Sequence, residues 1–297
     1  MTDKKFLAAF KAPATGRLFT WLVVLVCVLL LAIRYWIGNF DVSKVFSSII
    51  ESLLGTFLAA LGISAFYRYF APRNLASEIS IIEPRDLNPE FARLLAVTNS
   101  WRYKGNFGRW FRTEALPKLS DRAKNEHRDI EVSCIIIDPE NIQLCTLHAQ
   151  ARNAVRTADG KNDWTADDVR REVYATIVCC FAYRATLSMR LGLLNYFEPQ
   201  RFDISSTAAI ITREDRKAPA LRLNDGGYFS SAASRDYASA FEQCRAIPVV
   251  RNMLMLHALK QEDVLEVLSA AGLNDSFLNS EIMGICRKAS FSKNPYE

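Results

Sequence analysis

Two long apolar segments dominate the first quarter of the chain. Residues 18–33 carry no charge, and continuing to residue 37 gives a helix of about 30 Å, enough to cross the hydrocarbon core of a bilayer. Residues 45–67 form a second apolar segment, interrupted by Glu51 alone. The polar stretch 38–44 joins them, so the pattern predicts a helical hairpin that crosses the membrane twice. The same pattern leaves open a signal peptide, a buried core hairpin, or one span followed by an interfacial helix.

The charges beside the two segments predict the orientation of this hairpin. Four basic residues precede the first segment (Lys4, Lys5, Lys11 and Arg17), and Arg68 and Arg73 follow the second. Because cytoplasmic flanks carry the excess of Lys and Arg, both termini are expected in the cytoplasm of a bacterium, with the hairpin in its inner membrane. The predicted organisation is a basic cytoplasmic N-terminus at 1–17, a two-helix transmembrane hairpin at 18–70, a connector at 71–90, and a cytoplasmic α/β domain with a helical C-terminus at 91–297.

Small and polar residues in the second segment are candidates for association of several hairpins. Gly55, Ala59 and Gly62 recur at spacings of four and three, close to one helix face, where small side chains let helices approach closely. Glu51 either faces water at the headgroup level or faces the interior of such a bundle. The pattern therefore indicates a homo-oligomer in the active state.

The remaining residues show the alternation of strand and helix patterns that is typical of α/β proteins. Segment 129–138 begins with alternating polarity and ends in a β-branched run, which indicates a strand in a sheet covered on both faces. The pattern predicts further strands at 91–98 and 202–212, a turn at 99–106, and a hairpin around Asp225-Gly226. Helices are expected at 107–124, 138–156, 165–194, 234–256 and 261–270. This order predicts a largely parallel sheet covered by helices.

The net charge of +5 is confined to the first quarter. Eight of the 37 basic residues and three of the 32 acidic residues lie in 1–75, which leaves 29 of each sign in 76–297. This balance excludes a generally cationic coat for nucleic acid. One local exception is the segment 101–128, where basic and aromatic residues interleave, and it supplies the candidates for binding an anionic partner or nucleic acid: Trp101, Arg102, Tyr103, Lys104, Arg109, Trp110 and Arg112. The interpretation that we favour places these aromatic rings in the core and the charges on a solvated helix face.

No catalytic set is evident in the sequence. The chain lacks a phosphate-binding glycine loop, a Gly-x-Ser-x-Gly elbow and a His-Glu-x-x-His motif. The three histidines, His127, His148 and His257, are far apart in sequence, and the adjacent Cys179 and Cys180 have no second pair. We therefore expect no enzyme activity, no cofactor and no metal site.

Three segments in order carry a resemblance to a known family. They begin WRYKGNFGRWFR, IEVSCIIIDPENIQLC and RFDISSTAAIIT, and together they resemble the phospholipase D-like α/β domains of prokaryotic antiphage systems over residues 91–245. The catalytic His-x-Lys signature of that family is missing, because Asp129, Gln150 and Leu259 stand two positions after the three histidines. The resemblance therefore implies the fold but not phosphodiester hydrolysis.

With two spans ahead of such a domain, the chain resembles the two-span transmembrane effectors of retron antiphage systems. This resemblance implies an effector that a reverse transcriptase and its multicopy single-stranded DNA hold inactive, and that disrupts the inner membrane when it is released, causing abortive infection. Two alternatives stay open. One is a membrane-tethered phosphodiesterase or nuclease with a degenerate site, and the other is a membrane-anchored nucleotide or nucleic-acid sensor.

Overall fold

A computed structural model of the chain describes residues 55–56, 78–156, 163–215, 217–248 and 254–291. The chain divides into two compact units, Met1–Leu75 and Ala76–Glu297. Gly55 and Thr56 of the first unit are helical and exposed. No helix within the described ranges has the length and apolarity needed to cross a bilayer. Apart from residues 55–56, both predicted spans lie outside those ranges, as do Glu51, Ala59 and Gly62.

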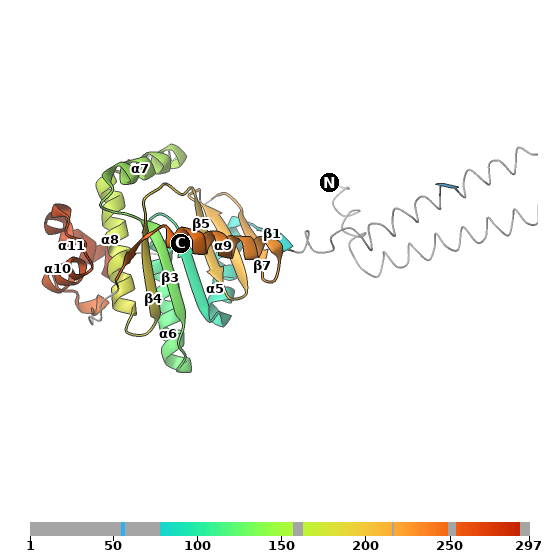
Figure 1. The fold of residues 1–297 in the computed structure, drawn as a ribbon, viewed down its shortest axis with the longest axis horizontal. Helices are drawn as coiled ribbons and strands as arrows, with labels where there is room; N and C mark the ends of the chain where they lie inside the picture. Colours follow the sequence, from blue (N-terminus) through green and yellow to red (C-terminus); the bar gives the residue numbers. More distant parts are fainter. Residues whose placement is uncertain (1–54, 57–77, 157–162, 216, 249–253, 292–297) are drawn as a thin grey trace, which may run out of the picture. The chain divides into compact units, whose positions relative to one another are not determined.

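The second unit has a mixed α/β fold built on an eight-stranded sheet (Figure 1). Its described strands are β1 (Ile79–Ile82), β2 (Ser100–Lys104), β3 (Glu131–Ile137), β4 (Ser188–Leu194), β5 (Gln200–Ser205), β6 (Ala208–Arg213), β7 (Ala220–Asn224) and β8 (Arg245–Ile247). They lie in the order β1-β7-β6-β5-β2-β3-β4-β8. The pairs β2–β3 and β3–β4 are parallel, and the other five pairs are antiparallel. The parallel strands β2, β3 and β4 are therefore adjacent, with β5 on one side of them and β8 on the other.

Seven α-helices accompany the strands in the described part of this unit. They are α5 (Leu87–Val97), α6 (Leu116–Glu126), α7 (Ile142–Arg156), α8 (Ala166–Tyr183), α9 (Tyr228–Glu242), α10 (Gln261–Ala270) and α11 (Ser276–Phe291). A π-helical turn, Phe111–Ala115, leads into α6, and short 3-10 turns lie at Pro84–Asp86 and Leu256–Ala258. The helical C-terminus expected from the sequence is therefore present.

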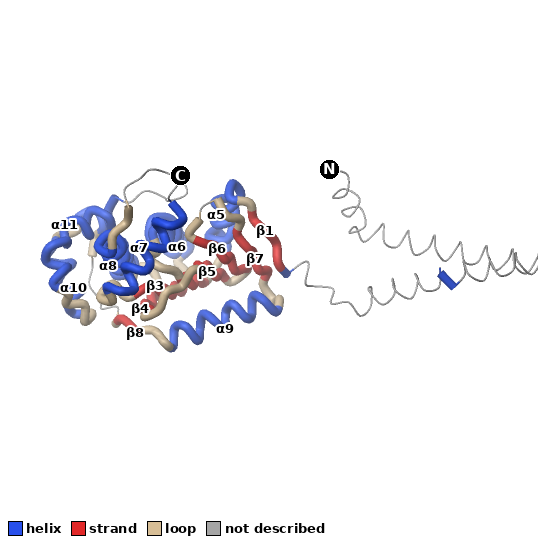
Figure 2. Tube along the Cα trace, turned by 90° about the horizontal axis from the view of Figure 1, so that it is seen from above, coloured by secondary structure: helices blue, strands red, loops and turns tan. Residues whose placement is uncertain are grey.

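The two faces of the sheet are covered very differently (Figure 2). Helix α9 lies on one side of the strands, and α5, α6 and α7 lie on the other. The larger core cluster includes Trp101, Val132 and Cys134 together with apolar residues of α5, α6 and α8. A smaller cluster packs Ile135 and Phe202 against Tyr237 of α9. The described residues leave part of the α9 face uncovered, between that helix and strands β2, β3 and β4.

Several expected elements differ from those observed. The predicted strand 91–98 belongs to helix α5, because Leu87, Phe91, Leu94 and Leu95 bury one helical face. The predicted turn 99–106 contains strand β2 instead. The predicted connector 71–90 includes β1, whose Ile79 and Ile82 pair with β7, so these residues belong to the sheet.

The expectation of a largely parallel sheet was wrong. The predicted strand 202–212 is two strands, β5 and β6, because Ser205 Oγ accepts the backbone N–H groups of Thr207 and Ala208 and closes a tight turn. The predicted helix 165–194 ends at Tyr183 and is followed by β4. The turn at Asp225-Gly226 is present, with a positive φ at Gly226, but it leads into α9 rather than a strand.

Candidate functional site

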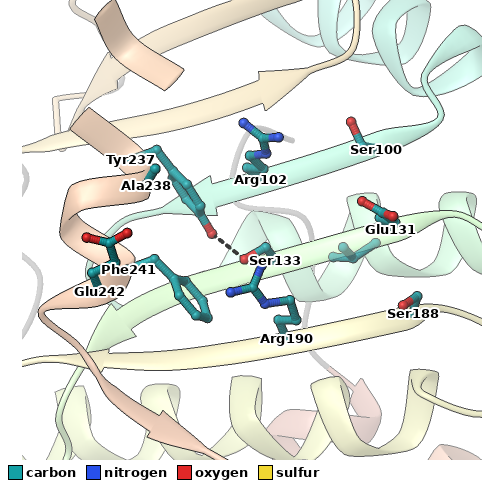
Figure 3. A pocket seen from close by; sticks show the side chains of 11 residues that line it. Ser100, Arg102, Glu131, Ser133, Ser188, Arg190, Tyr237, Ala238, Phe241 and Glu242 are labelled. Atoms are coloured by element: carbon teal, nitrogen blue, oxygen red, sulfur yellow. Dashed lines mark hydrogen bonds between the residues drawn. The ribbon is translucent and has the colours of Figure 1, made fainter. Parts of the chain in front are cut away.

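The open part of the α9 face forms a pocket of about 400 Å³ between that helix and strands β2, β3 and β4. Figure 3 shows Tyr237 and Phe241 of α9 beside Arg102, Ser133 and Arg190 of the strands, with Ser100, Glu131 and Ser188 further along the same strands. The lining residues are Ser100, Arg102, Glu131, Val132, Ser133, Ser188, Arg190, Tyr237, Ala238, Phe241 and Glu242. A volume of this size is within the range of small-molecule sites.

Parallel pairing arranges the polar residues of the strands in two rows. The first row runs Ser100, Glu131, Ser188 and the second runs Arg102, Ser133, Arg190, each across β2, β3 and β4. Because alternate residues of a strand face the same side, both rows project toward the pocket. The register therefore brings two guanidinium groups to either side of one serine hydroxyl.

Helix α9 supplies the opposite wall with aromatic side chains. The Tyr237 hydroxyl donates a hydrogen bond of 2.8 Å to Ser133 Oγ, as Figure 3 shows. The Arg190 guanidinium lies 4.3 Å from the centroid of the Phe241 ring, a cation–π distance. Tyr237 is buried, together with Ala233 and Ala240 of the same helix. These contacts fix the position of α9 over the second row.

The Tyr237–Ser133 pair has a defined protonation. Burial raises the pKa of Tyr237, while the Ser133 hydrogen bond and the Arg102 guanidinium oppose the rise. The phenol is therefore protonated at neutral pH and acts as the donor. A serine hydroxyl has one hydrogen to donate. Since Ser133 accepts from Tyr237, its own hydrogen is available to an acceptor in the pocket.

The two pocket arginines differ from most others in the domain. Arg109, Arg112 and Arg245 form ion pairs with carboxylates. Within the described ranges, by contrast, neither Arg102 nor Arg190 has a carboxylate within ion-pair distance, and both are exposed. A pair of uncompensated guanidinium groups beside a hydroxyl donor is suited to bind an anion.

The predicted cationic aromatic segment is not a continuous surface. Trp101, Tyr103 and Trp110 are buried, as the favoured interpretation expected, and the Trp110 ring centroid lies 4.1 Å from that of Phe91. Strand alternation separates Trp101 and Tyr103, on the α5–α8 face, from Arg102 and Lys104 on the α9 face. Of the seven candidates Arg102 alone is exposed, and it belongs to the pocket.

The other charges of this segment are not on a solvated helix face, which corrects that part of the expectation. Lys104 is buried, and its ammonium lies 2.9 Å from Glu198 Oε2. Arg109 and Arg112 both pair with Glu172 of α8. The Glu172 carboxylate is almost fully buried and also contacts Lys288 Nζ of α11 at 2.8 Å. These cations therefore connect elements of the core.

The carboxyl ends of the parallel strands, where α/β proteins often bind ligands, hold charges that are satisfied within the fold. Arg245 pairs with Asp138 at 2.9 Å and with Glu140 at 2.7 Å. Asn141 Nδ2 donates to Asn195 Oδ1 at 2.5 Å. The described residues contain no cluster of His, Cys, Asp or Glu that could hold a metal ion.

The histidines and cysteines of the described part form no nucleophile–base pair. His148 is fully buried beside Phe107, and burial lowers its pKa to about 4, so the ring is neutral. Burial raises the pKa of Cys145, one turn earlier on α7, to about 12, which keeps the thiol protonated. His127 is the left-handed C-cap of α6, and His257 lies in an exposed 3-10 turn.

Sequence reasoning identified Arg102 but missed most of the pocket. Glu131, Ser133 and Arg190 come from strands whose alternation is visible in the sequence, so their common face could have been recognised. Their arrangement into rows depends on the parallel register of β2, β3 and β4. Tyr237 depends on where α9 crosses the sheet, which no local pattern reveals.

Comparisons with known proteins add little to this geometry. No protein-family profile and no curated protein sequence match the chain. The solved structures that match include "Structure of TrmBL2, an archaeal chromatin protein, shows a novel mode of DNA binding", at 8% sequence identity and a TM-score of 0.35. That match covers 67% of this chain and 66% of the TrmBL2 chain, so the present chain spans about two thirds of that protein. At this TM-score the likeness carries no argument about function, and the pocket is interpreted from its own residues.

Proposed function

We propose that this chain is a nonenzymatic membrane effector of prokaryotic antiphage defence, of the retron type. In this proposal the hairpin at 18–70 lies in the bacterial inner membrane, and the phospholipase D-like domain lies in the cytoplasm. A reverse transcriptase and its multicopy single-stranded DNA hold the effector inactive. Released hairpins associate through Glu51, Gly55, Ala59 and Gly62 and disrupt the membrane, causing abortive infection.

The apolar first quarter supports the membrane part of the proposal. Its two segments are long enough for spans, and six of its eight basic residues lie at the ends expected to face the cytoplasm, against Arg34 and Lys44 near the turn. The net positive charge of the chain is confined to this quarter. The division of the chain at residue 75 agrees with a membrane unit followed by a separately folded domain.

One observation supports a binding role for the second unit, namely the row Arg102, Ser133, Arg190 in an open pocket. The row offers hydrogen-bond donors and positive charge, while the lining holds no histidine or cysteine to act as base or nucleophile. An arrangement of this kind can bind an anionic ligand without transforming it. We assign to this domain the task of sensing and restraint.

The experiment that tests the proposal measures membrane potential with a dye in cells that express the chain without its partners. Expression of the parent chain should collapse the potential within the time in which growth stops. The substitutions Gly55→Leu and Gly62→Leu should prevent this loss, because they fill the positions where helices approach. Val24→Leu is the matched control and should leave toxicity unchanged. Growth arrest with the potential intact would contradict the proposal.

A further inference from the structure

The pocket between α9 and strands β2–β4 carries an inference about its ligand. We propose that it binds a nucleoside monophosphate, with the phosphate on the row Arg102, Ser133, Arg190 and the base toward Glu131. The inference concerns the pocket that the proposed function uses, and it depends on that function only for its biological role.

The second row fits one phosphate group. Neighbouring strands lie about 4.8 Å apart, so the Cα atoms of Arg102 and Arg190 are separated by roughly 10 Å across Ser133. Two long side chains at this separation can converge on one anion above the serine. Guanidinium groups match phosphate oxygens through paired N–H donors, and the Ser133 hydrogen adds a further donor.

The first row requires a different chemical group at the other end of the ligand. Glu131 is exposed between Ser100 and Ser188, and among the described residues it has no ion-pair partner. A carboxylate repels a second anion and accepts hydrogen bonds from N–H groups. The two rows are two residues apart along the strands, about 6.6 Å. The ligand should therefore carry its anion and its N–H donors at separate ends.

Size and the aromatic wall favour a nucleotide over smaller anions. The pocket of about 400 Å³ is much larger than a phosphate ion, and Tyr237 and Phe241 border it with ring surface. The carboxylates of Glu131 and Glu242 disfavour a continuous polyanion such as a nucleic-acid backbone. A nucleoside monophosphate combines one dianionic end with a flat base that bears N–H donors.

Calorimetric titration of the full-length chain in detergent micelles tests this assignment. GMP is the probe, because guanine presents two adjacent N–H donors to a carboxylate. GMP should bind saturably and at least tenfold more tightly than guanosine, inorganic phosphate or phosphoethanolamine. The absence of saturable GMP binding, or equal or tighter binding of inorganic phosphate or phosphoethanolamine, would overturn the assignment.

Variants locate the binding and separate it from folding. Arg102→Gln and Arg190→Gln should each weaken GMP binding at least tenfold. Glu131→Gln should weaken the binding of GMP but leave the binding of inorganic phosphate unchanged. The exposed arginine Arg235 of α9 does not line the pocket, so Arg235→Gln is the matched control and should bind GMP as the parent does. All four should keep the parent's thermal unfolding midpoint. GMP binding that survives both arginine substitutions would refute the site, whereas the membrane-potential experiment would be unaffected by that result.

Discussion

Glu172 is a single buried carboxylate that joins three parts of the domain. It accepts from Arg109 and Arg112, which lie before and within the π-helical turn, and from Lys288 of α11. Burial alone would raise its pKa, but the neighbouring cations Arg112, Arg109 and Lys288 outweigh this and lower the pKa far below its usual value. The carboxylate is thus charged in the folded protein and compensated by its neighbours.

Replacing this carboxylate should therefore be costly. Glu172→Gln leaves Arg112 buried without its counter-charge, and we expect a loss of about 3–5 kcal/mol in the free energy of unfolding. Urea unfolding of the full chain, monitored by tryptophan fluorescence, measures this change in the free energy of unfolding. Glu131→Gln, at an exposed carboxylate, is the control and should change stability by less than about 0.5 kcal/mol. A similarly small effect of Glu172→Gln would show that the cluster does not stabilise the fold.

Two buried titratable residues act on stability in opposite directions. Burial lowers the pKa of His148 from 6.5 to about 4. As the pH falls through this range, the unfolded chain binds a proton on His148 and the folded chain does not. The free energy of unfolding therefore falls as the pH falls. Burial raises the pKa of Asp203 from 3.8 to about 7. The folded chain keeps that proton, so the contribution of Asp203 is lost as the pH rises toward 7. Between pH 4 and 6.5 the two effects oppose each other.

Single substitutions should expose each effect separately. Relative to the parent, Asp203→Asn should gain stability as the pH rises from 4 to 6.5, and His148→Phe should lose it, each by about 3 kcal/mol. The asparagine can still accept the hydrogen bond from Trp101 Nε1, and phenylalanine keeps the packing against Phe107. Unfolding midpoints in urea at four pH values provide the measurement. Parallel pH profiles for parent and variants would contradict the assigned protonation states.

At the scale of elements, the sequence correctly predicted the features that depend on neighbouring residues alone. The capping box before α8 is present: Thr165 Oγ1 accepts from Asp168 N at 3.2 Å, and Asp168 Oδ2 accepts from Thr165 N at 3.0 Å. Strand β3 was also predicted, because its β-branched run is buried on both faces. Both signals lie within a few residues and need no knowledge of distant neighbours.

The capping box has a measurable contribution. Thr165→Ala should lower the free energy of unfolding by about 1 kcal/mol, because the Asp168 N–H loses its partner. Thr165→Ser keeps the hydroxyl and should retain most of the stability, which makes it the matched control. Equal losses in the two variants would indicate that packing of the threonine methyl group, not the cap, is responsible.

The elements that were missed depend on pairing between distant segments. The short window 91–98 contains too few residues to distinguish the buried face of α5 from a strand, and β2 is too short and polar to be recognised alone. Whether a strand runs parallel or antiparallel is decided by its connection, as in the two-residue turn between β5 and β6. The same dependence explains why the sequence pointed to Arg102 but not to Ser133 and Arg190, its neighbours in the second row.

At the scale of the whole molecule, the chain combines an apolar first unit with an α/β domain that has a pocket between α9 and the sheet. The proposal assigns membrane disruption to the first and restraint to the second. Since the two tasks lie in different units, they should be separable by deletion.

The most direct test of this account is the membrane potential of cells that express residues 71–297 without the first 70 residues. The account predicts that this fragment accumulates at the level of the full chain and leaves both the potential and growth unchanged. Collapse of the potential, or growth arrest, by residues 71–297 alone would contradict the claim that the apolar unit carries the toxic activity.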